Sequence, residues 1–136
     1  MLLAIDTSTV QLGLALYDDA TVAAELTWSS RQRHTVELAP ALAGLLSRTG
    51  ISMGDLSALG VAIGPGSFTS LRVGLAFAKG LALARKIPII GVPTLDVVAA
   101  SQPVQAIPLA AVLQAGRTRV AVGWYQASEN RWQAEG

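Results

Sequence analysis

The chain has 136 residues, of which 51% are hydrophobic and 14% charged, and its formal net charge is +1. Its mean hydropathy of +0.47 is high for a water-soluble protein. This length is enough for one domain with a substantial core and short for two. So small a net charge supplies no long-range field that would attract nucleic acid or an acidic membrane surface. The chain has no cysteine and a single histidine, His34, which excludes disulfides and thiolate metal sites.

The opening of the chain predicts three strands. Leu2–Asp6 is a short apolar run typical of a buried strand. Turn residues then separate it from Gln11–Tyr17, and a second turn precedes Thr21–Trp28. Strands joined by such short turns form an antiparallel meander.

The next segment alternates helices and strands. From Thr35 to about Arg48, leucines recur at the spacing of one helix face, and Gly50 is suited to end that helix. The elements expected after it are a strand at Leu59–Ile63, a helix at Thr69–Arg85, a strand at Ile87–Val92 and a short helix from Thr94 to Ser101. Three strands followed by helix, strand, helix and strand predict an α/β layer with a mixed sheet.

Composition changes near Ser101–Pro103, which reads as a linker. We therefore expect residues 1–101 to form a first lobe and residues 104–136 to begin a second one. Ile107–Leu113 and Val120–Tyr125 predict two strands of a new meander, and a third begins at Arg131. No helix follows that could cover these strands, and a small open sheet is not stable alone. The expectation is a truncated chain, or a fragment of a longer two-lobed protein.

No targeting or membrane segment is expected. The N-terminus lacks a basic region and a cleavage-type site, so we expect a cytoplasmic protein. The longest apolar helix candidate, Val73–Ala84, is interrupted by Lys79 and is too short to span a bilayer.

A glycine-rich turn joins the strand at Leu59–Ile63 to the long helix. Gly64 and Gly66 permit backbone angles that a side chain would forbid, and Ser67 can cap the helix. A strand, a glycine turn and a helix N-terminus gather backbone N–H groups where an anion can rest. The alternative is a tight, capped connection that binds no ligand.

The helix Thr69–Arg85 is more apolar than a helix lying on one sheet requires. Arg72 and Lys79 share one face, and small residues stand four apart in two stripes: Gly74 and Ala78 in one, Ala76, Gly80 and Ala84 in the other. Such stripes permit close helix packing. Either a partner protein packs on this helix, or the neighbouring helix from Thr35 covers the additional apolar surface.

Several of these motifs together resemble the bacterial TsaB (YeaZ) family, a paralogue of the TsaD proteins once labelled glycoproteases. The resemblance runs from Met1 to about Ser101 and rests on Asp6-Thr7-Ser8-Thr9, the meander after it, Gly64-Pro65-Gly66-Ser67-Phe68-Thr69, and Arg33-His34 before Glu37-Leu38-Ala39-Pro40. It implies an actin-like ATPase, ribonuclease H-like fold built as two similar lobes.

The resemblance also implies a function. The family works in the tRNA modification that makes threonylcarbamoyladenosine next to the anticodon, where TsaD transfers the group and TsaB supports it together with the ATPase TsaE. It implies a non-catalytic subunit that contacts a TsaD-like transferase directly, a TsaE-like ATPase through the complex, tRNA only indirectly, and a second copy of itself when alone. The helix pair is the expected interface, with contacts from Leu42, Leu45, Leu46, Arg72, Ala76, Lys79 and Gly80.

The TsaD catalytic centre has no counterpart in this chain. TsaD-like proteins carry two metal-binding histidines spaced HxxxH, and the resemblance places Thr94 and Val98 at those positions. Neither side chain replaces an imidazole ligand. The chain also departs from its own family, because Gln114-Ala115-Gly116-Arg117 stands where an Asp-Ala-Arg turn is common.

A nucleotide-using enzyme of the actin-like class, an ATPase or phosphotransferase, is the alternative. In that fold an acid at the position of Asp6 commonly lies near bound phosphates, so ATP or ADP would sit on Asp6, Thr7, Gly64, Gly66 and Ser67. The other interpretation of Asp6 is a turn carboxylate that bonds the backbone after it. Protease activity has the least support, because no nucleophile and base can be paired.

Overall fold

The computed structural model describes residues 1–31 and 33–136. Its larger sheet has five strands in the order β3-β2-β1-β4-β5. The strands are β1 (Leu2–Asp6), β2 (Gln11–Tyr17), β3 (Val22–Ser29), β4 (Ala58–Ala62) and β5 (Ile89–Val92). β2 runs antiparallel to β1 and β3, whereas β4 runs parallel to β1 and β5. This mixed sheet confirms the predicted α/β class.

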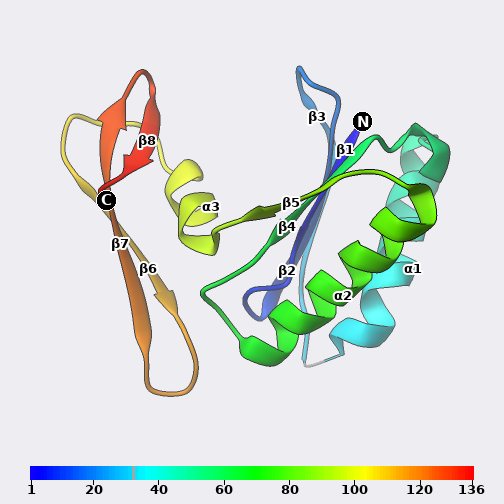
Figure 1. Ribbon diagram of the computed structural model, residues 1–136, viewed down its shortest axis with the longest axis horizontal. Helices are drawn as coiled ribbons and strands as arrows, with labels where there is room; N and C mark the ends of the chain where they lie inside the picture. The colour runs from blue at the N-terminus through cyan, green and yellow to red at the C-terminus, as the bar shows by residue number, and fades with distance from the viewer. Residues whose placement is uncertain (32) are drawn as a thin grey trace.

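Two helices, α1 (His34–Thr49) and α2 (Phe68–Arg85), cover one face of this sheet, and a short 3-10 turn, η1 (Met53–Asp55), follows α1 (Figure 1). Gly50 takes the left-handed conformation at the end of α1, as predicted. Alternate residues of β1, β2 and β4 point toward the helices, as the period of a strand requires. With the leucines of α1 they form one core, whose fully buried members include Leu3, Ile5, Leu14, Leu16, Leu38, Leu59 and Val61.

Two strands begin two residues later than their apolar runs suggested. β5 starts at Ile89 rather than Ile87, and β6 (Leu109–Gln114) starts at Leu109 rather than Ile107. In both places a proline, Pro88 or Pro108, immediately precedes the strand. Proline has no N–H to donate to a strand ladder, so it sets the boundary.

The second sheet has three strands, β6, β7 (Val120–Ser128) and β8 (Arg131–Ala134), in that order. The short helix α3 (Thr94–Ala100) packs on it, and Ala99, Ala111 and Tyr125 form a small separate core there. The expectation that no helix would cover this sheet was wrong. α3 lies before the predicted boundary at 101–104, yet it covers the strands after it, because its apolar side chains Leu95, Val98 and Ala99 pack against that sheet.

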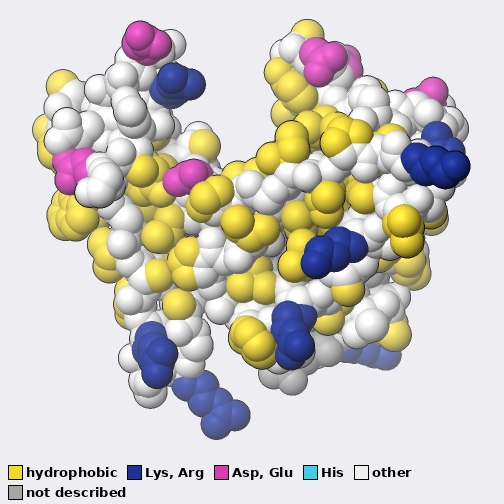
Figure 2. Space-filling view, viewed as in Figure 1, with side chains coloured by type: hydrophobic (Ala, Val, Ile, Leu, Met, Phe, Trp, Pro, Cys, Tyr) yellow, Lys and Arg dark blue, Asp and Glu magenta, His cyan; other side chains and the backbone are white. Residues whose placement is uncertain are grey.

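The opposite face of the second sheet is open. Val112, Val120, Val122 and Trp124 each leave more than half of their surface exposed there. In the five-stranded sheet, the face away from α1 and α2 is turned toward α3 and the second sheet, and a hollow separates the two parts (Figures 1 and 2). Within the described residues, no helix has both the length and the apolar character needed to cross a bilayer.

Candidate functional site

The outward face of α2 carries large apolar and basic side chains together. Phe68 is 72% exposed and Leu83 is 82% exposed, at opposite ends of the helix. Arg72 and Lys79 are exposed between them, with the small residue Ala76 in the middle. The face therefore has an apolar side chain at each end and two cations between them. In Figure 2, Lys and Arg side chains lie among hydrophobic ones over this helix.

A groove runs between the first turns of α1 and α2. It encloses about 470 Å³ and is lined by Thr35 and Leu38 of α1 and by Phe68, Thr69, Arg72, Val73, Ala76 and Phe77 of α2. The Arg72 guanidinium lies 4.8 Å from the centre of the Phe68 ring, a cation–π distance that holds both side chains at the rim. The groove therefore offers an apolar floor with one positive charge beside it.

The three leucines predicted for this interface lie elsewhere. Leu42 is only 4% exposed, and Leu45 and Leu46 are also buried, because all three pack into the core between α1 and the sheet. The sequence correctly marked an apolar face of α1, but that face is covered by the chain itself. These residues hold the helix pair in place and are not available to a partner.

The two small-residue stripes of α2 have opposite positions. Gly74, Ala78 and Ala82 are buried against the sheet, whereas Ala76 and Gly80 are exposed. A Cβ at Gly74 would lie 2.1 Å from Thr7 Oγ1, so only glycine lets α2 approach the end of β1 this closely. A Cβ at Gly80 would meet nothing within 4 Å. The outer stripe, with Arg72 and Lys79, is therefore free to contact another molecule.

The glycine loop lies against the turn after β1, and its backbone donors are partly used there. The Ser67 N–H donates to Ser8 O at 2.8 Å, and the Gly64 N–H donates to Thr94 Oγ1 at 3.1 Å. A Cβ at Gly66 would lie 2.4 Å from Ser8 O, which explains why glycine stands there. Ser67 occupies the N-cap position of α2, but its side chain makes no capping hydrogen bond.

Asp6 and Thr7 are also engaged within the chain. Asp6 Oδ1 accepts hydrogen bonds from Ser8 N at 2.8 Å and from Ser8 Oγ at 2.6 Å. The buried Thr7 hydroxyl donates to Ser70 O at 2.7 Å. The structure thus brings Asp6, Thr7, Gly66 and Ser67 together around Ser8, in the arrangement of a braced turn.

The surroundings of Asp6 are poorly suited to a phosphate. A hollow of about 430 Å³ on the uncovered face of the five-stranded sheet is lined mainly by apolar residues such as Leu2, Ile90 and Val92. Its ionisable lining residues are Asp6 and Glu25, both acidic. In the described ranges, no three histidine or acidic side chains gather in a way that could hold a metal ion.

Sequence reasoning missed Phe68 and the role of Thr94. Phe68 precedes the predicted helix start by one residue. Its spacing of four and eight residues from Arg72 and Ala76 places all three on one helix face, and this spacing could have identified Phe68 from the sequence. Thr94 is fully buried and accepts the Gly64 N–H, a contact between residues thirty apart that no local pattern reveals.

Comparison with known proteins places this arrangement in a family. Residues 21–135 match the model of the family described as TsaD, tRNA N6-adenosine threonylcarbamoyltransferase. The chain is 39% identical to the tRNA threonylcarbamoyladenosine biosynthesis protein TsaB of Escherichia coli, over 98% of this chain and 59% of that protein. It is also 39% identical to TsaB of Bacillus subtilis, over 92% of this chain and 55% of that protein.

A solved structure supports the same relationship. YeaZ from Pseudomonas aeruginosa superposes with a TM-score of 0.88 at 29% identity, covering 99% of this chain and 63% of that one. The fold is thus the actin-like, ribonuclease H-like fold expected from the sequence. The chain spans somewhat more than half the length of these TsaB relatives. It belongs to the TsaD family of tRNA threonylcarbamoyladenosine proteins, and within that family to the TsaB (YeaZ) branch.

Proposed function

We propose that this protein is a non-catalytic subunit that binds a TsaD-like threonylcarbamoyl transferase and supports the modification of adenosine next to the tRNA anticodon. The observation that carries the proposal is the outward face of α2. Phe68 and Leu83 are largely exposed, and the groove beside Phe68 is apolar. Large apolar side chains exposed next to an apolar groove are typical of a protein interface.

The chemistry of the α2 face fits a protein partner better than a small substrate. Its polar groups are the cations Arg72 and Lys79, which lie at the edge of apolar surface. Arginine and aromatic residues, here Arg72 and Phe68, are enriched in protein interfaces. We therefore place a TsaD-like transferase on α2 and the adjoining turn of α1, with acidic groups opposite Arg72 and Lys79.

The positions of the TsaD histidines have other roles in this chain. Thr94 Oγ1 accepts the Gly64 N–H, and Val98 packs in the small core under the second sheet. Both residues are thus committed to holding α3 in place. This supports a subunit that contributes a surface and leaves catalysis to its partner.

Nucleotide binding at the glycine loop has less support. The Gly64 and Ser67 N–H groups already donate hydrogen bonds within the chain. The ionisable residues that line the hollow next to Asp6 are Asp6 itself and Glu25, and both are acidic. ATP or ADP binding there would require these bonds to open. It stays the alternative proposal, and titration calorimetry of ATP with magnesium against the isolated protein separates the two.

The remaining contacts follow from the same proposal. A TsaE-like ATPase would join through the complex, tRNA would be contacted by the transferase, and the assembly would act in the cytoplasm. Without the transferase, the exposed α2 face would pair with a second copy of this protein, since a two-fold dimer is the commonest way to cover such a surface.

An assay with purified components tests the proposal. It follows threonylcarbamoyladenosine in tRNA while this protein, the TsaD-like transferase and the TsaE-like ATPase are omitted one at a time. We expect no product without the transferase and a large loss of product without this protein. Product formed by this protein in the absence of the transferase, or full activity when this protein is left out, contradicts the proposal.

A further inference from the structure

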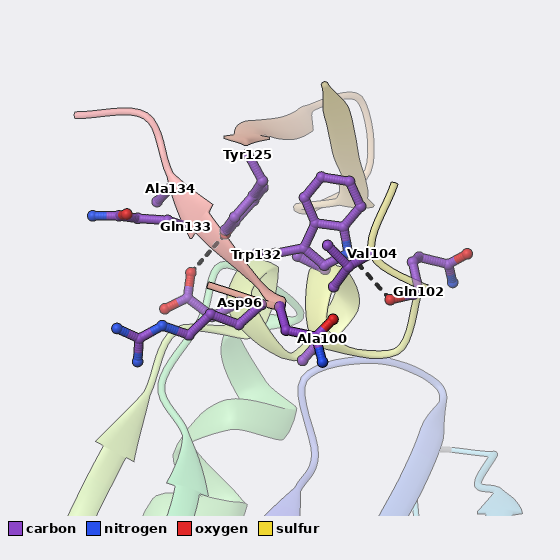
Figure 3. Close-up of a pocket in the computed structure, with 11 residues that line it drawn as sticks. Asp96, Ala100, Gln102, Val104, Tyr125, Trp132, Gln133 and Ala134 are labelled. Carbon is purple, nitrogen blue, oxygen red and sulfur yellow. Dashed lines mark hydrogen bonds between the residues drawn. The ribbon is translucent and has the colours of Figure 1, made fainter. Parts of the chain in front are cut away.

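A second candidate site lies far from the α2 face, between α3 and the edge of the second sheet. It is a cavity of about 550 Å³, within the size range of small-molecule sites. Its walls are Asp96, Ala99 and Ala100 of α3, Gln102 and Val104 of the following loop, and Tyr125, Asn130, Arg131, Trp132, Gln133 and Ala134 of the second sheet (Figure 3).

Two hydrogen bonds fix the chemically active groups of this cavity. The Tyr125 hydroxyl donates to Asp96 Oδ1 at 2.6 Å, and the Trp132 indole N–H donates to Gln102 O at 3.1 Å (Figure 3). The first bond orients the carboxylate and leaves its other oxygen, Oδ2, without a donor among the described residues. The second bond orients the indole ring, which is only partly buried. A fixed acceptor and a fixed aromatic surface are the features of a preorganised binding site.

The remaining lining narrows the class of ligand. Asp96 and Arg131 carry opposite charges, so the cavity has no net charge and does not favour a ligand that has one. Asn130, in the turn before β8, carries an amide that both donates and accepts hydrogen bonds. The small side chain of Ala100, which is exposed on α3, leaves room for a flat molecule.

We propose that this cavity binds a planar nitrogen heterocycle that carries an amino group, the chemistry of adenine. Its amino group donates to Asp96 Oδ2, its ring contacts the Trp132 indole, and a ring nitrogen accepts a hydrogen bond from the Asn130 amide. Bases are recognised in this manner, by aromatic contact and by hydrogen bonds to their edges, in proteins that bind unpaired RNA. The same chemistry is offered by a free nucleoside and by an unpaired base of an RNA strand.

Fluorescence of Trp132 tests the proposal on the isolated protein, so its outcome is independent of any transferase partner. The two other tryptophans are replaced first, by Trp28→Phe in β3 and by Trp124→Phe on the opposite, exposed face of the second sheet, so that Trp132 is the remaining fluorophore. Adenosine is then titrated, and purine riboside, which has the same ring and sugar without the amino group, is the matched probe. A hexamer of adenylate serves as the RNA probe.

We expect saturable quenching by adenosine, and binding of purine riboside weaker by roughly tenfold, the effect of losing a hydrogen bond to a charged acceptor. Asp96→Asn should weaken adenosine binding by a similar factor. Ala100→Phe, which fills the cavity from α3 without removing any hydrogen bond, should abolish it. Trp132→Phe should remove the quenching signal.

The outcomes are distinct. Quenching by adenosine assigns the site to free nucleosides, whereas quenching by the hexamer alone, sensitive to Asp96→Asn, assigns it to a base in RNA. No saturable quenching by either probe overturns the proposal. So does equal binding of adenosine and purine riboside, or adenosine binding that survives Ala100→Phe in a protein whose melting temperature is unchanged.

Discussion

The inward and outward faces of the helix pair α1–α2 are built from similar residues and have different roles. Inward, Leu42 of α1 and the stripe Gly74, Ala78 and Ala82 of α2 are buried against the sheet. Outward, α2 presents the stripe Ala76 and Gly80, flanked by exposed Phe68 and Leu83. Leucine and glycine occur on both faces, so residue type does not distinguish folding from binding. Only the structure shows which side is covered.

The largest expected contrast is between two leucines. Leu42→Ala should lower the free energy of unfolding by about 2–5 kcal/mol, because it removes a buried side chain and leaves a cavity. Leu83→Ala should change it by less than about 0.5 kcal/mol, since Leu83 is 82% exposed. Urea denaturation of both variants measures the difference. Equal losses at the two positions would mean that Leu83 is covered.

The same substitution on the two stripes of α2 should act in opposite directions. Gly74→Ala forces a Cβ toward Thr7 Oγ1 and should destabilise the protein by about 1–3 kcal/mol. Gly80→Ala enters open space and should stabilise it by about 0.5–1 kcal/mol through helix propensity. Thermal unfolding of the pair checks this. A stabilising Gly74→Ala would show that α2 does not approach β1 this closely.

A smaller effect is expected where α3 joins the second sheet, outside the helix pair. Burial and the hydrogen bond to Asp96 raise the pKa of Tyr125 to about 12 from a usual value of 10.0. The folded state favours the protonated phenol, so this group's contribution to stability is complete below pH 10. It is lost as the pH rises through about 12.

Tyr125→Phe should therefore lower the free energy of unfolding by about 1–2 kcal/mol near neutral pH. The free energy of unfolding of this variant should also fall less between pH 10 and 12 than that of the native protein. The control is Tyr17→Phe, at an exposed position of β2, which should leave the free energy of unfolding near neutral pH almost unchanged. Denaturation across this pH range provides the measurement. A variant at position 125 that keeps the native pH dependence would exclude Tyr125 as its source.

Gly80→Glu should have the smallest effect on the free energy of unfolding but a clear effect on dimer formation. Alone at micromolar concentrations, the protein should form a two-fold dimer through α2, and Gly80→Glu should shift it toward monomer by placing a charge in the outer stripe. Its unfolding free energy should stay close to that of the native chain. Sedimentation velocity reports both species, and a native protein that sediments as a monomer would refute the self-association.

Sequence patterns predicted the elements of the five-stranded sheet and its two helices closely. β1 and β2 occupy the predicted residues, and α1 and α2 begin one residue earlier than expected. These signals are local, since strand alternation, helix periodicity and Gly50 each act within a few residues. The order of elements then determined the mixed sheet, because a strand that follows a crossover helix pairs in parallel.

The predictions that were wrong concern tertiary packing, that is, which element or partner covers each apolar face. The spacing of Leu42, Leu45 and Leu46 identifies an apolar face but does not say whether the sheet or a partner covers it. In the same way, α3 is apolar enough for either sheet, and its packing on the second sheet depends on tertiary contacts such as Tyr125 with Asp96. The bond from Ser67 to Ser8 O, which uses a donor of the predicted anion site, joins residues nearly sixty positions apart.

The central claim is that the outward face of α2 binds a TsaD-like transferase, and one pair of variants tests it most directly. Gly80→Glu places a charge in the outer stripe of α2. Gly44→Glu is the control and places the same charge on α1, where a side chain also meets open space. Gly44 lies two helical turns after Glu37 and therefore on the same face of α1. Glu37 accepts a hydrogen bond from Trp28 of β3, so this face is turned away from α2. Titration calorimetry with the purified transferase should show binding weakened by roughly tenfold or more for Gly80→Glu and unchanged for Gly44→Glu. Equal binding by the two variants would contradict the claim.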